Sequence, residues 1–439
     1  GKEYGAPTHT YYVPDGDSGN YHLYVLADDG LIYAPKICDS LFKEMVALTD
    51  VYAANLDVKY TTKMAMMFMG CSSLATLAGT ENWDVSKVTT MSLMFSGCQK
   101  LAALDVSKWK TNSLTDASSL FNSCASLRTL DVSSWEVDNV TKMNAMFSGC
   151  EALDTLNVSQ WNVGNVQEMN AMFSGCSALT SLDVSGWNVE NVNNFTEMFK
   201  NCSVLTSLDV SKWKTSNATL MGSMFYRCEN LAILDVSKWD VRNVTAMNLM
   251  FFKCTALAKL ESSSWDTSKV TTMESMFSSC SSLTELDTSK WDTANVTTMA
   301  QMFNGCKALT NIDVSGWNTS SVTTMQSMFQ NCLNLMNIDV SSWDTSKVTT
   351  MQNMFYKCTK MTKLDAPNWN TSKVTTMANM FQFCSELTEI NVLNWDTSKV
   401  TTMASMFSYC SSLTKLEASG WDTADVTDMS YMFTGCAEL

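Results

Sequence analysis

The chain has 439 residues, of which 46% are hydrophobic, and a formal net charge of −15 at pH 7. An acidic surface repels phosphates, so we expect no nucleic-acid partner. No apolar run approaches the roughly 18 residues that a membrane-spanning helix needs, so we expect no membrane span. The chain begins at Gly1 without a signal peptide and stops in mid-repeat at Leu439, which predicts a piece of a longer protein.

The first 37 residues differ in pattern from the rest of the chain. Residues 8–13 and 21–25 are rich in aromatic and β-branched side chains, and they flank a turn-rich segment at 14–20. This pattern predicts two strands around a turn, so we interpret residues 1–37 as a β-rich cap or linker. Asp15, Asp17 and Asn20 resemble part of a calcium loop, but the remaining ligand positions are missing and no metal site is assigned.

From residue 38 onward the sequence repeats every 26 residues. All fourteen tryptophans follow this spacing from Trp83 to Trp421, and fourteen cysteines follow it from Cys98 to Cys436. A fixed period of this length predicts a solenoid, in which similar coils stack on one another. We expect about fifteen coils over residues 38–439, with 38–83 as degenerate N-terminal coils and the last coil incomplete. Positions within a coil are numbered from its tryptophan, which is zero.

Two hydrophobic patterns alternate within each coil. Apolar residues at +5, +8, +11, +12 and +15 have the spacing of one helix face, as in Val270, Met273, Met276, Phe277 and Cys280. From +18 to +23 the pattern Leu-x-x-Leu-Asp-Val is typical of a short strand. The sequence therefore predicts an α/β repeat solenoid, leucine-rich-repeat-like, with one short parallel strand and one short helix in every coil.

The tryptophans and cysteines each form a column along the predicted stack. The tryptophans are interpreted as core, and the alternative is an exposed aromatic stripe that stacks on sugars. Of the sixteen cysteines, fifteen fall at one repeat position, so their side chains point in the same direction instead of toward each other. That geometry disfavours disulfides and predicts buried free thiols.

The strings Met276-Phe277-Ser278-Ser279-Cys280 and Trp343-Asp344-Thr345-Ser346-Lys347-Val348 recur with little change. With the repeated Leu-Asp-Val-Ser-x-Trp, they make residues 38–439 resemble the BspA-like leucine-rich repeat family, the bacterial surface protein 26-residue repeat. The resemblance implies a surface or secreted protein of the kind credited with adhesion, and it implies no particular ligand.

The sequence carries no convergent set of catalytic residues. Its two histidines, His9 and His22, lie outside the repeats, and each full coil has one cysteine at a core position. A histidine-based triad or zinc cluster therefore cannot form within the array, and there is no Gly-rich phosphate loop. We expect no enzymatic activity and no cofactor.

The residue at −4 is expected to point out of the predicted sheet, because −5 and −3 are apolar and strand residues alternate. Aspartate occupies this position in most coils: Asp105, Asp131, Asp183, Asp209, Asp235, Asp287, Asp313, Asp339 and Asp365. Mutual repulsion should raise their pKa values. Two explanations remain open: serine at −2 and a turn-forming role offset this cost, or the column binds cations or a basic partner. Position −6 beside it varies from coil to coil.

Threonine recurs at +2 and at +6/+7, and a flat exposed threonine array would point to ice or mineral binding. Valine replaces threonine at +2 in several coils, which predicts that +2 points inward. The expected function is a non-catalytic extracellular or cell-surface adhesion module that binds a protein or glycan through the face carrying the aspartates. The alternative is a structural building block of a surface layer or extracellular filament, formed by self-association.

Overall fold

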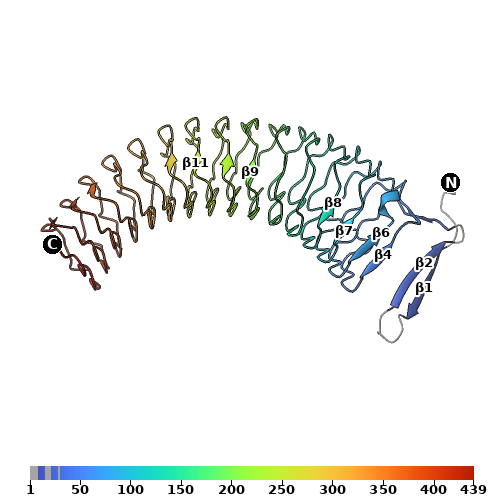
Figure 1. Ribbon diagram of the computed structural model, residues 1–439, viewed down its shortest axis with the longest axis horizontal. Coiled ribbons are helices and arrows are strands. Elements are labelled where there is room, and N and C mark those ends of the chain that lie inside the picture. Colours follow the sequence, from blue (N-terminus) through green and yellow to red (C-terminus); the bar gives the residue numbers. More distant parts are fainter. Residues whose placement is uncertain (1–7, 15–20, 28–29) are drawn as a thin grey trace. The chain divides into compact units, whose positions relative to one another are not determined.

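The computed structural model describes residues 8–14, 21–27 and 30–439. The chain divides into two compact units, residues 1–187 and 188–439, and each is described by itself. Both units are β-solenoids, with about fifteen turns of parallel strand in all (Figure 1). This confirms the solenoid that the 26-residue period predicts.

In the first unit β1 (Thr8–Pro14) pairs with β2 (Tyr21–Ala27) in antiparallel orientation, which confirms the two predicted strands. The turn predicted between them lies outside the described residues. The other elements of this unit are β3 (Ile32–Tyr33), β4 (Asp50–Tyr52), β5 (Leu56–Asp57), β6 (Thr76–Ala78), the 3₁₀ helix η1 (Thr80–Asn82), β7 (Ala103–Leu104) and β8 (Thr129–Leu130). β3 pairs with β5, β4 with β6 and β7 with β8, all in parallel. Parallel pairing therefore starts at Ile32.

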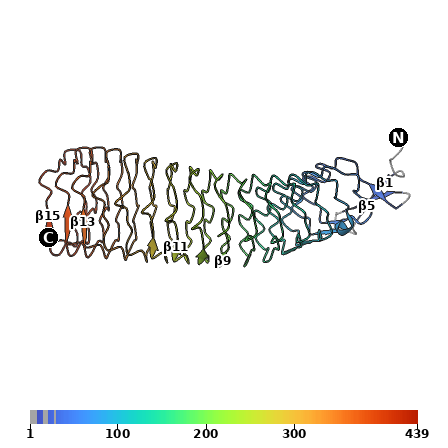
Figure 2. The ribbon, with the colours of Figure 1, turned by 90° about the horizontal axis from the view of Figure 1, so that it is seen from above.

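The second unit repeats the same strand position along its coils. Its strands are β9 (Ser207–Leu208), β10 (Ile233–Leu234), β11 (Lys259–Leu260), β12 (Glu285–Leu286), β13 (Lys363–Asp365), β14 (Glu389–Asn391) and β15 (Lys415–Leu416). Figure 2 shows β9, β11, β13 and β15 on the same side of this unit. The strands of this unit begin at −6 and end at −5, or at −4 in β13 and β14, inside the predicted strand segment. A second parallel ladder of single bridges runs through position +7, as between Thr272 and Thr298.

The prediction of one helix per coil is wrong. The short η1 is the only helix in the described part of the chain, and the segment from +8 to +15 is a run of turns in every coil. Among the described residues there is also no helix long and apolar enough to cross a membrane.

Hydrogen bonding explains why this segment is not helical. In the coil that begins at Trp83, Met94 N donates to Met91 O (3.1 Å) and Cys98 N donates to Phe95 O (3.0 Å), which closes successive turns. Between them, Phe95 N donates to Leu120 O of the next coil (2.9 Å). In a helix every one of these N–H groups would donate to a carbonyl of its own segment. Here alternate N–H groups donate to the neighbouring coil instead.

Backbone conformation also shows that this segment is not helical. Positions +10 and +14 have positive φ in successive coils, as in Ser275 (55°) and Ser279 (65°). A positive φ at the third residue of a turn is typical of type II turns, and two such residues four positions apart interrupt any α-helix. Each turn brings the chain back to the core after three residues. The spacing of three between apolar residues therefore comes from turn closure.

Glycine at one of these positions should stabilise the fold. We expect Ser279→Gly to raise the free energy of unfolding by roughly 0.5–1 kcal/mol, because the left-handed conformation penalises a Cβ and glycine adopts it freely. Ser282→Gly is the matched control, since Ser282 is not among the residues with positive φ, and it should destabilise by a similar amount. Thermal melts of both variants measure the difference. Equal destabilisation by the two would contradict the assigned conformation.

The core consists of columns of identical side chains. The tryptophans from Trp83 to Trp395 are at most 4% exposed. Within each unit most neighbouring rings stack, with centroids 5.6–6.5 Å apart and interplanar angles of 3–11°. Most also donate a hydrogen bond from Nε1 to a carbonyl of the preceding coil, as Trp369 does to Val340 (3.1 Å). The interpretation of the tryptophans as core is confirmed.

The cysteines are free thiols, and fifteen of the sixteen are buried. From Cys98 to Cys436, Sγ typically donates to the carbonyl of a phenylalanine in the preceding coil, at 3.0–3.2 Å for Cys98, Cys280 and Cys410. Burial raises the pKa of Cys98, Cys150 and Cys280 to about 12. These thiols are therefore small core side chains that stay protonated, not nucleophiles.

The threonines at +2 and +6 have opposite exposure. Thr267 at +2 is buried, and its Oγ1 donates to Asp292 O of the next coil (2.8 Å). Thr271 at +6 is exposed, and its Oγ1 donates to Thr245 O of the preceding coil (3.0 Å). Position +2 therefore points inward, as predicted, and cannot contribute to a flat surface array.

Candidate binding surface

Side chains at −6 and −4 point outward on either side of a buried residue at −5. In β13, Lys363 and Asp365 are exposed and Leu364 between them is buried, and β14 has the same alternation. The strands are short, but the alternation expected for the Leu-x-x-Leu-Asp-Val segment is present. We call the exposed −6 and −4 side chains of each unit its sheet surface.

All nine aspartates of the predicted binding face are exposed on the sheet surfaces. The first unit holds Asp105, Asp131 and Asp183, and the second unit holds Asp209, Asp235, Asp287, Asp313, Asp339 and Asp365. Within each unit the structure therefore aligns them in one row, which is the arrangement expected from their shared repeat position.

Each aspartate except Asp365 also closes a turn. Asp287 Oδ1 accepts hydrogen bonds from Ser289 N (3.0 Å) and Ser289 Oγ (2.7 Å), and the other seven accept the same pair from the serine at −2. Pro367 stands at that position after Asp365 and has no N–H to donate. The turn-forming role is therefore present in the structure, and it does not prevent a second role in binding.

The predicted upward shift of the carboxyl pKa values is wrong. The pKa is lowered for Asp105, Asp131, Asp209, Asp235, Asp287 and Asp339, and the largest cause in each is the side-chain hydrogen bond from serine. The charge of Asp105 does raise the pKa of Asp131, but this is its smallest cause. Hydrogen bonding to the ionised form outweighs repulsion between exposed carboxylates, which water screens.

Acid should weaken these turns. A carboxyl whose pKa is lower in the folded state binds its proton more readily when unfolded, so its stabilising effect is present above the ordinary value of 3.8 and is lost as the pH falls through the folded value. We expect the melting temperature to decline below about pH 4. A variant with Asp287 and Asp339 changed to Asn should decline less. Asn157 shows that Asn keeps the turn, because its Oδ1 accepts from Ser159 N and Oγ. Equal acid sensitivity of the variant and the parent would contradict the assignment.

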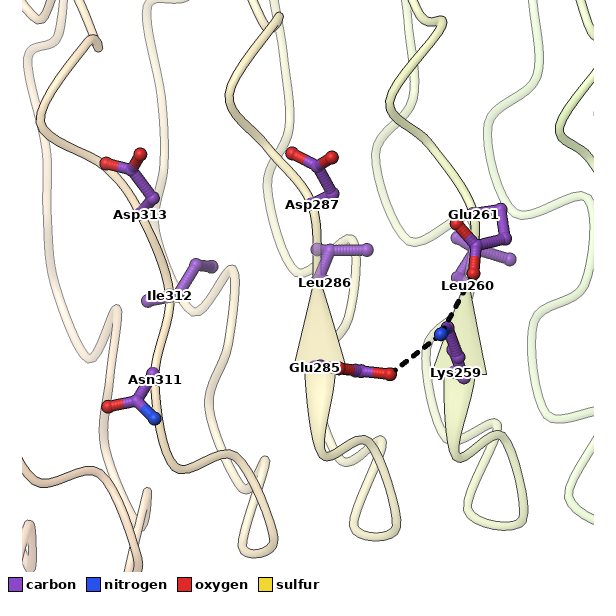
Figure 3. A pocket seen from close by; sticks show the side chains of 9 residues that line it. All are labelled: Lys259, Leu260, Glu261, Glu285, Leu286, Asp287, Asn311, Ile312 and Asp313. Atoms are coloured by element: carbon purple, nitrogen blue, oxygen red, sulfur yellow. Dashed lines mark ion pairs between the residues drawn. The ribbon is translucent and has the colours of Figure 1, made fainter.

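A shallow depression lies on the sheet surface of each unit. In the second unit it measures about 350 Å³ and is lined by the −6, −5 and −4 residues of three coils. Figure 3 shows Glu261, Asp287 and Asp313 in one row and Lys259 and Glu285 in the other. Lys259 Nζ lies 3.1 Å from Glu261 Oε1 and 2.9 Å from Glu285 Oε1. One lysine is therefore held between two carboxylates, and the local charge stays negative.

The depression in the first unit measures about 440 Å³ and is uncharged on one side. Thr129, Thr155 and Ser181 form its −6 row, opposite Asp131 and Asp183 in the −4 row. Both depressions therefore have a hydroxyl, amide or charged row facing a mainly acidic row. Their open form is suited to contact with a surface rather than to enclosing a small molecule.

Position −6 carries the chemical variety of the surface in the second unit. The exposed residues there, in chain order, are Ser207, Ile233, Lys259, Glu285, Asn311, Asn337, Lys363, Glu389 and Lys415. Ile233 is 70% exposed, which is high for a large apolar side chain. Successive coils therefore present different chemical groups at the same −6 position, which include hydroxyl, apolar, basic, acidic and amide groups.

The structure brings no metal-binding set together in residues 30–439. Within that range no three His, Cys, Asp or Glu side chains gather in an arrangement that could hold a metal ion. Asp15, Asp17 and Asn20, which resemble part of a calcium loop, lie outside the described residues, as do the side chains of His9 and His22.

The turn run from +8 to +15 leaves partly exposed several side chains that the sequence had assigned to a helix. In the second unit these include Tyr356, Phe383 and Tyr409 and many amides. Their signal in the sequence is a local excess of Asn, Gln and aromatic residues at +9, +10, +13 and +14. A helix would also place these four positions on one face, opposite the apolar side chains, so the excess marks an outward-facing strip in either conformation.

The chain was compared with known proteins by sequence. No curated protein matches it. A family profile described as "Mycoplasma protein of unknown function, DUF285" matches residues 37–155, 125–233, 153–263, 202–307, 284–367 and 359–439. These overlapping matches cover the whole repeat array. The chain therefore belongs to the DUF285 family.

Proposed function

We propose that this chain is a non-catalytic binding module for adhesion, exposed at a cell surface or outside the cell, which recognises a protein or glycan through its sheet surfaces. The resemblance of its Met-Phe-x-x-Cys and Leu-Asp-Val-Ser-x-Trp strings to BspA-like leucine-rich repeats supports the location and the adhesive role. The geometry supports the binding role independently.

The observation that carries the proposal is the contrast between −5 and its neighbours. Position −5 is a buried Leu or Ile in nearly every coil, whereas −6 changes from coil to coil in charge, size and polarity. A fixed buried frame with varied exposed residues presents a distinct chemical sequence to a partner. The two shallow depressions both lie on this surface.

Charge favours a basic protein segment as the partner. In the second unit the −4 row is acidic from Asp209 to Asp365, and Lys259, the lysine of the depression, is already paired with Glu261 and Glu285. A row of carboxylates attracts lysine and arginine over a distance of roughly one Debye length, about 8 Å at physiological salt. An acidic glycan would be repelled from the same row.

The test compares two variants with the same change of charge. The first changes Asp287, Asp313 and Asp339 to Asn in the −4 row, and the second changes Asp266, Asp292 and Asp344 to Asn at +1. The +1 residues also accept a backbone N–H two residues on, and Asn318 and Asn370 do the same in other coils. Both variants should therefore fold normally.

The labelled chain is applied to arrays of purified matrix proteins and of oligosaccharides. We expect binding to basic proteins that weakens with added salt and that the −4 variant, but not the +1 variant, reduces at least tenfold. An equal loss of binding in both variants would mean that only the net charge of the chain matters and not the position of the aspartates on the sheet surface. Binding that neither variant changes would place the contact elsewhere. No binding to any probe, together with concentration-dependent polymers, would favour the structural building block.

A further inference from the structure

We propose that the turn run of the second unit contains a glycan-binding site that is separate from the sheet surface. The site comprises positions +9, +10, +13 and +14 of the five coils that begin at Trp291, Trp317, Trp343, Trp369 and Trp395. We call these residues the turn strip. Amides, aromatic rings and one free lysine gather there, and no carboxylate occurs among its residues.

Half-buried amides dominate the turn strip. They are Gln301, Asn304, Gln326, Gln330, Asn331, Gln352, Asn353, Asn379 and Gln382. The structure gives none of these side-chain amides a hydrogen bond to any described residue, whereas Asn295 in the same unit donates from Nδ2 to Ser268 O (2.7 Å). Their donors and acceptors are therefore available to a ligand. A planar amide can accept from one hydroxyl group and donate to the next, which suits the adjacent hydroxyls of a sugar ring.

Three aromatic side chains from consecutive coils adjoin these amides. The ring centroids of Phe383 and Tyr409 are 4.9 Å apart and stacked, and Tyr356 meets Phe383 edge-on at 5.8 Å. Lys357 Nζ lies 5.4 Å from the ring centroids of both Tyr356 and Phe383. The structure shows no ion pair between Lys357 and any described carboxylate. The cluster therefore offers ring surface for C–H groups and one cation for an acidic substituent.

Position +14 accepts glycine in place of a large side chain. Phe383 and Tyr409 stand there with φ of 64° and 59°, and Gly305 and Gly435 occupy the same position in other coils with φ of 76°. The positive φ belongs to the turn geometry of the repeat, so glycine can replace either ring without a change of backbone.

The chemistry favours a glycan over a protein partner. A protein interface has an apolar centre with a polar rim, whereas the turn strip mixes free amides with a few rings along its length. The absence of carboxylates among the turn-strip residues removes repulsion toward uronic or sialic acids, and Lys357 would attract them. The sheet surface of the same unit has the opposite charge, so the two surfaces should select different ligands.

The test uses variants that keep the backbone. Phe383→Gly combined with Tyr409→Gly removes both rings and places the residue that other coils already carry at +14. Ser279→Gly is the matched control, because it makes the same backbone change outside the turn strip. A third variant, Gln330→Ala combined with Gln382→Ala, removes amides but leaves the rings. Each protein is applied to an array of neutral, sialylated and uronate-containing oligosaccharides, and circular dichroism checks folding.

We expect the parent chain to bind a subset of these oligosaccharides. The ring variant (Phe383→Gly with Tyr409→Gly) should bind them at least tenfold more weakly, and the amide variant (Gln330→Ala with Gln382→Ala) should also bind more weakly than the parent. The Ser279→Gly control should bind normally. Absence of glycan binding by the folded parent, or binding that the ring and amide variants leave unchanged, would overturn the proposal. Loss of protein binding in the ring variant without any glycan binding would overturn the assignment to glycans. The −4 variant, with Asn in place of Asp287, Asp313 and Asp339, tests whether this site is independent of the sheet surface. It should bind glycans as the parent does.

Discussion

Raising the pH from about 9 toward 12 is expected to destabilise the solenoid progressively and to unfold it in reducing buffer. The ordinary thiol pKa is 9.0, and burial raises the pKa of Cys98, Cys150, Cys280 and Cys410 to about 12. Other cysteines of the column, including Cys254, are raised well above 9 by the same cause. The folded chain therefore holds protons that the unfolded chain releases.

The sign follows from proton linkage. A group with a raised folded pKa contributes its full stability below the unfolded value, and this stability is lost as the pH rises through the folded value. The loss thus starts near pH 9 and continues toward pH 12. At pH 10, one unit above the unfolded pKa, each thiol with a folded pKa of about 12 lowers the free energy of unfolding by roughly 1 kcal/mol. This follows because one pKa unit corresponds to about 1.36 kcal/mol. Several thiols in one unit together exceed the typical stability of about 5–15 kcal/mol before pH 12.

Circular dichroism and thiolate absorbance, recorded together during an alkaline titration, measure this effect. The two signals should change in the same narrow pH interval, because a buried thiol ionises only when its coil opens. Cys280→Ala removes one titrating group. Between pH 8 and 10 the free energy of unfolding of this variant should therefore decrease less than that of the parent, by the contribution of one thiol. Thiolate absorbance that rises near pH 9 while the circular dichroism stays constant would contradict the burial of the column.

Shortening one tryptophan of the core is expected to have the largest effect of any single substitution. Trp369 is 2% exposed, stacks on Trp343 and Trp395, and donates from Nε1 to Val340 O. Trp369→Ala should cost about 3–5 kcal/mol through lost burial and the cavity that remains. Trp369→Phe keeps a stacked ring but loses the hydrogen bond, and it should cost about 1–3 kcal/mol.

Trp317 offers a matched control for the hydrogen bond. It is also buried and stacked, but its Nε1 has no hydrogen-bond partner among the described residues. Trp317→Phe therefore removes a buried unsatisfied donor and should cost less than Trp369→Phe. Urea unfolding followed by circular dichroism gives the midpoints. The same cost for both Phe variants would show that the Nε1 bond contributes nothing measurable.

The 26-residue period predicted much of the architecture. Residues that recur at one position of a stacked coil must share one environment, so the invariant Trp83 to Trp421 series pointed to a buried column. The same reasoning predicted free thiols at Cys98 and beyond, and the alternation around Leu286 predicted its strand. Periodicity works here because each coil contacts only its neighbours, and neighbours have nearly the same sequence.

The helix was predicted wrongly because period alone does not distinguish turn closure from helical rotation. Both place apolar residues three or four positions apart, as at Met273, Met276 and Phe277. The sequence did contain a contrary signal. Gly97, Gly149 and Gly175 occupy +14, inside the supposed helix, and each has positive φ. A glycine that recurs inside a helical pattern predicts a left-handed residue rather than a continuing helix.

The candidate site was predicted in part. The outward aspartates were identified correctly by strand alternation, and the structure shows them exposed on the sheet surfaces. Serine at −2 and a turn-forming role were one of the two explanations that the sequence left open, and the structure shows both. That these hydrogen bonds outweigh the repulsion and lower the pKa values depends on turn geometry that spacing does not reveal. The turn strip was not predicted, although helical spacing would also place +9, +10, +13 and +14 on one outward face, because exposed amides and rings in a repeat do not by themselves indicate a ligand. Neither binding role follows from sequence pattern alone.

Light scattering after size exclusion tests the central claim that the exposed surfaces are free to bind a different molecule. The purified chain is measured over a wide range of concentration. The binding-module account predicts a constant mass near the 48.7 kDa of one chain, for the parent and for the variant with Asn in place of Asp287, Asp313 and Asp339. A mass that grows with concentration in the parent and not in this variant would contradict the account, because the sheet surface would then be joining copies of the chain to one another.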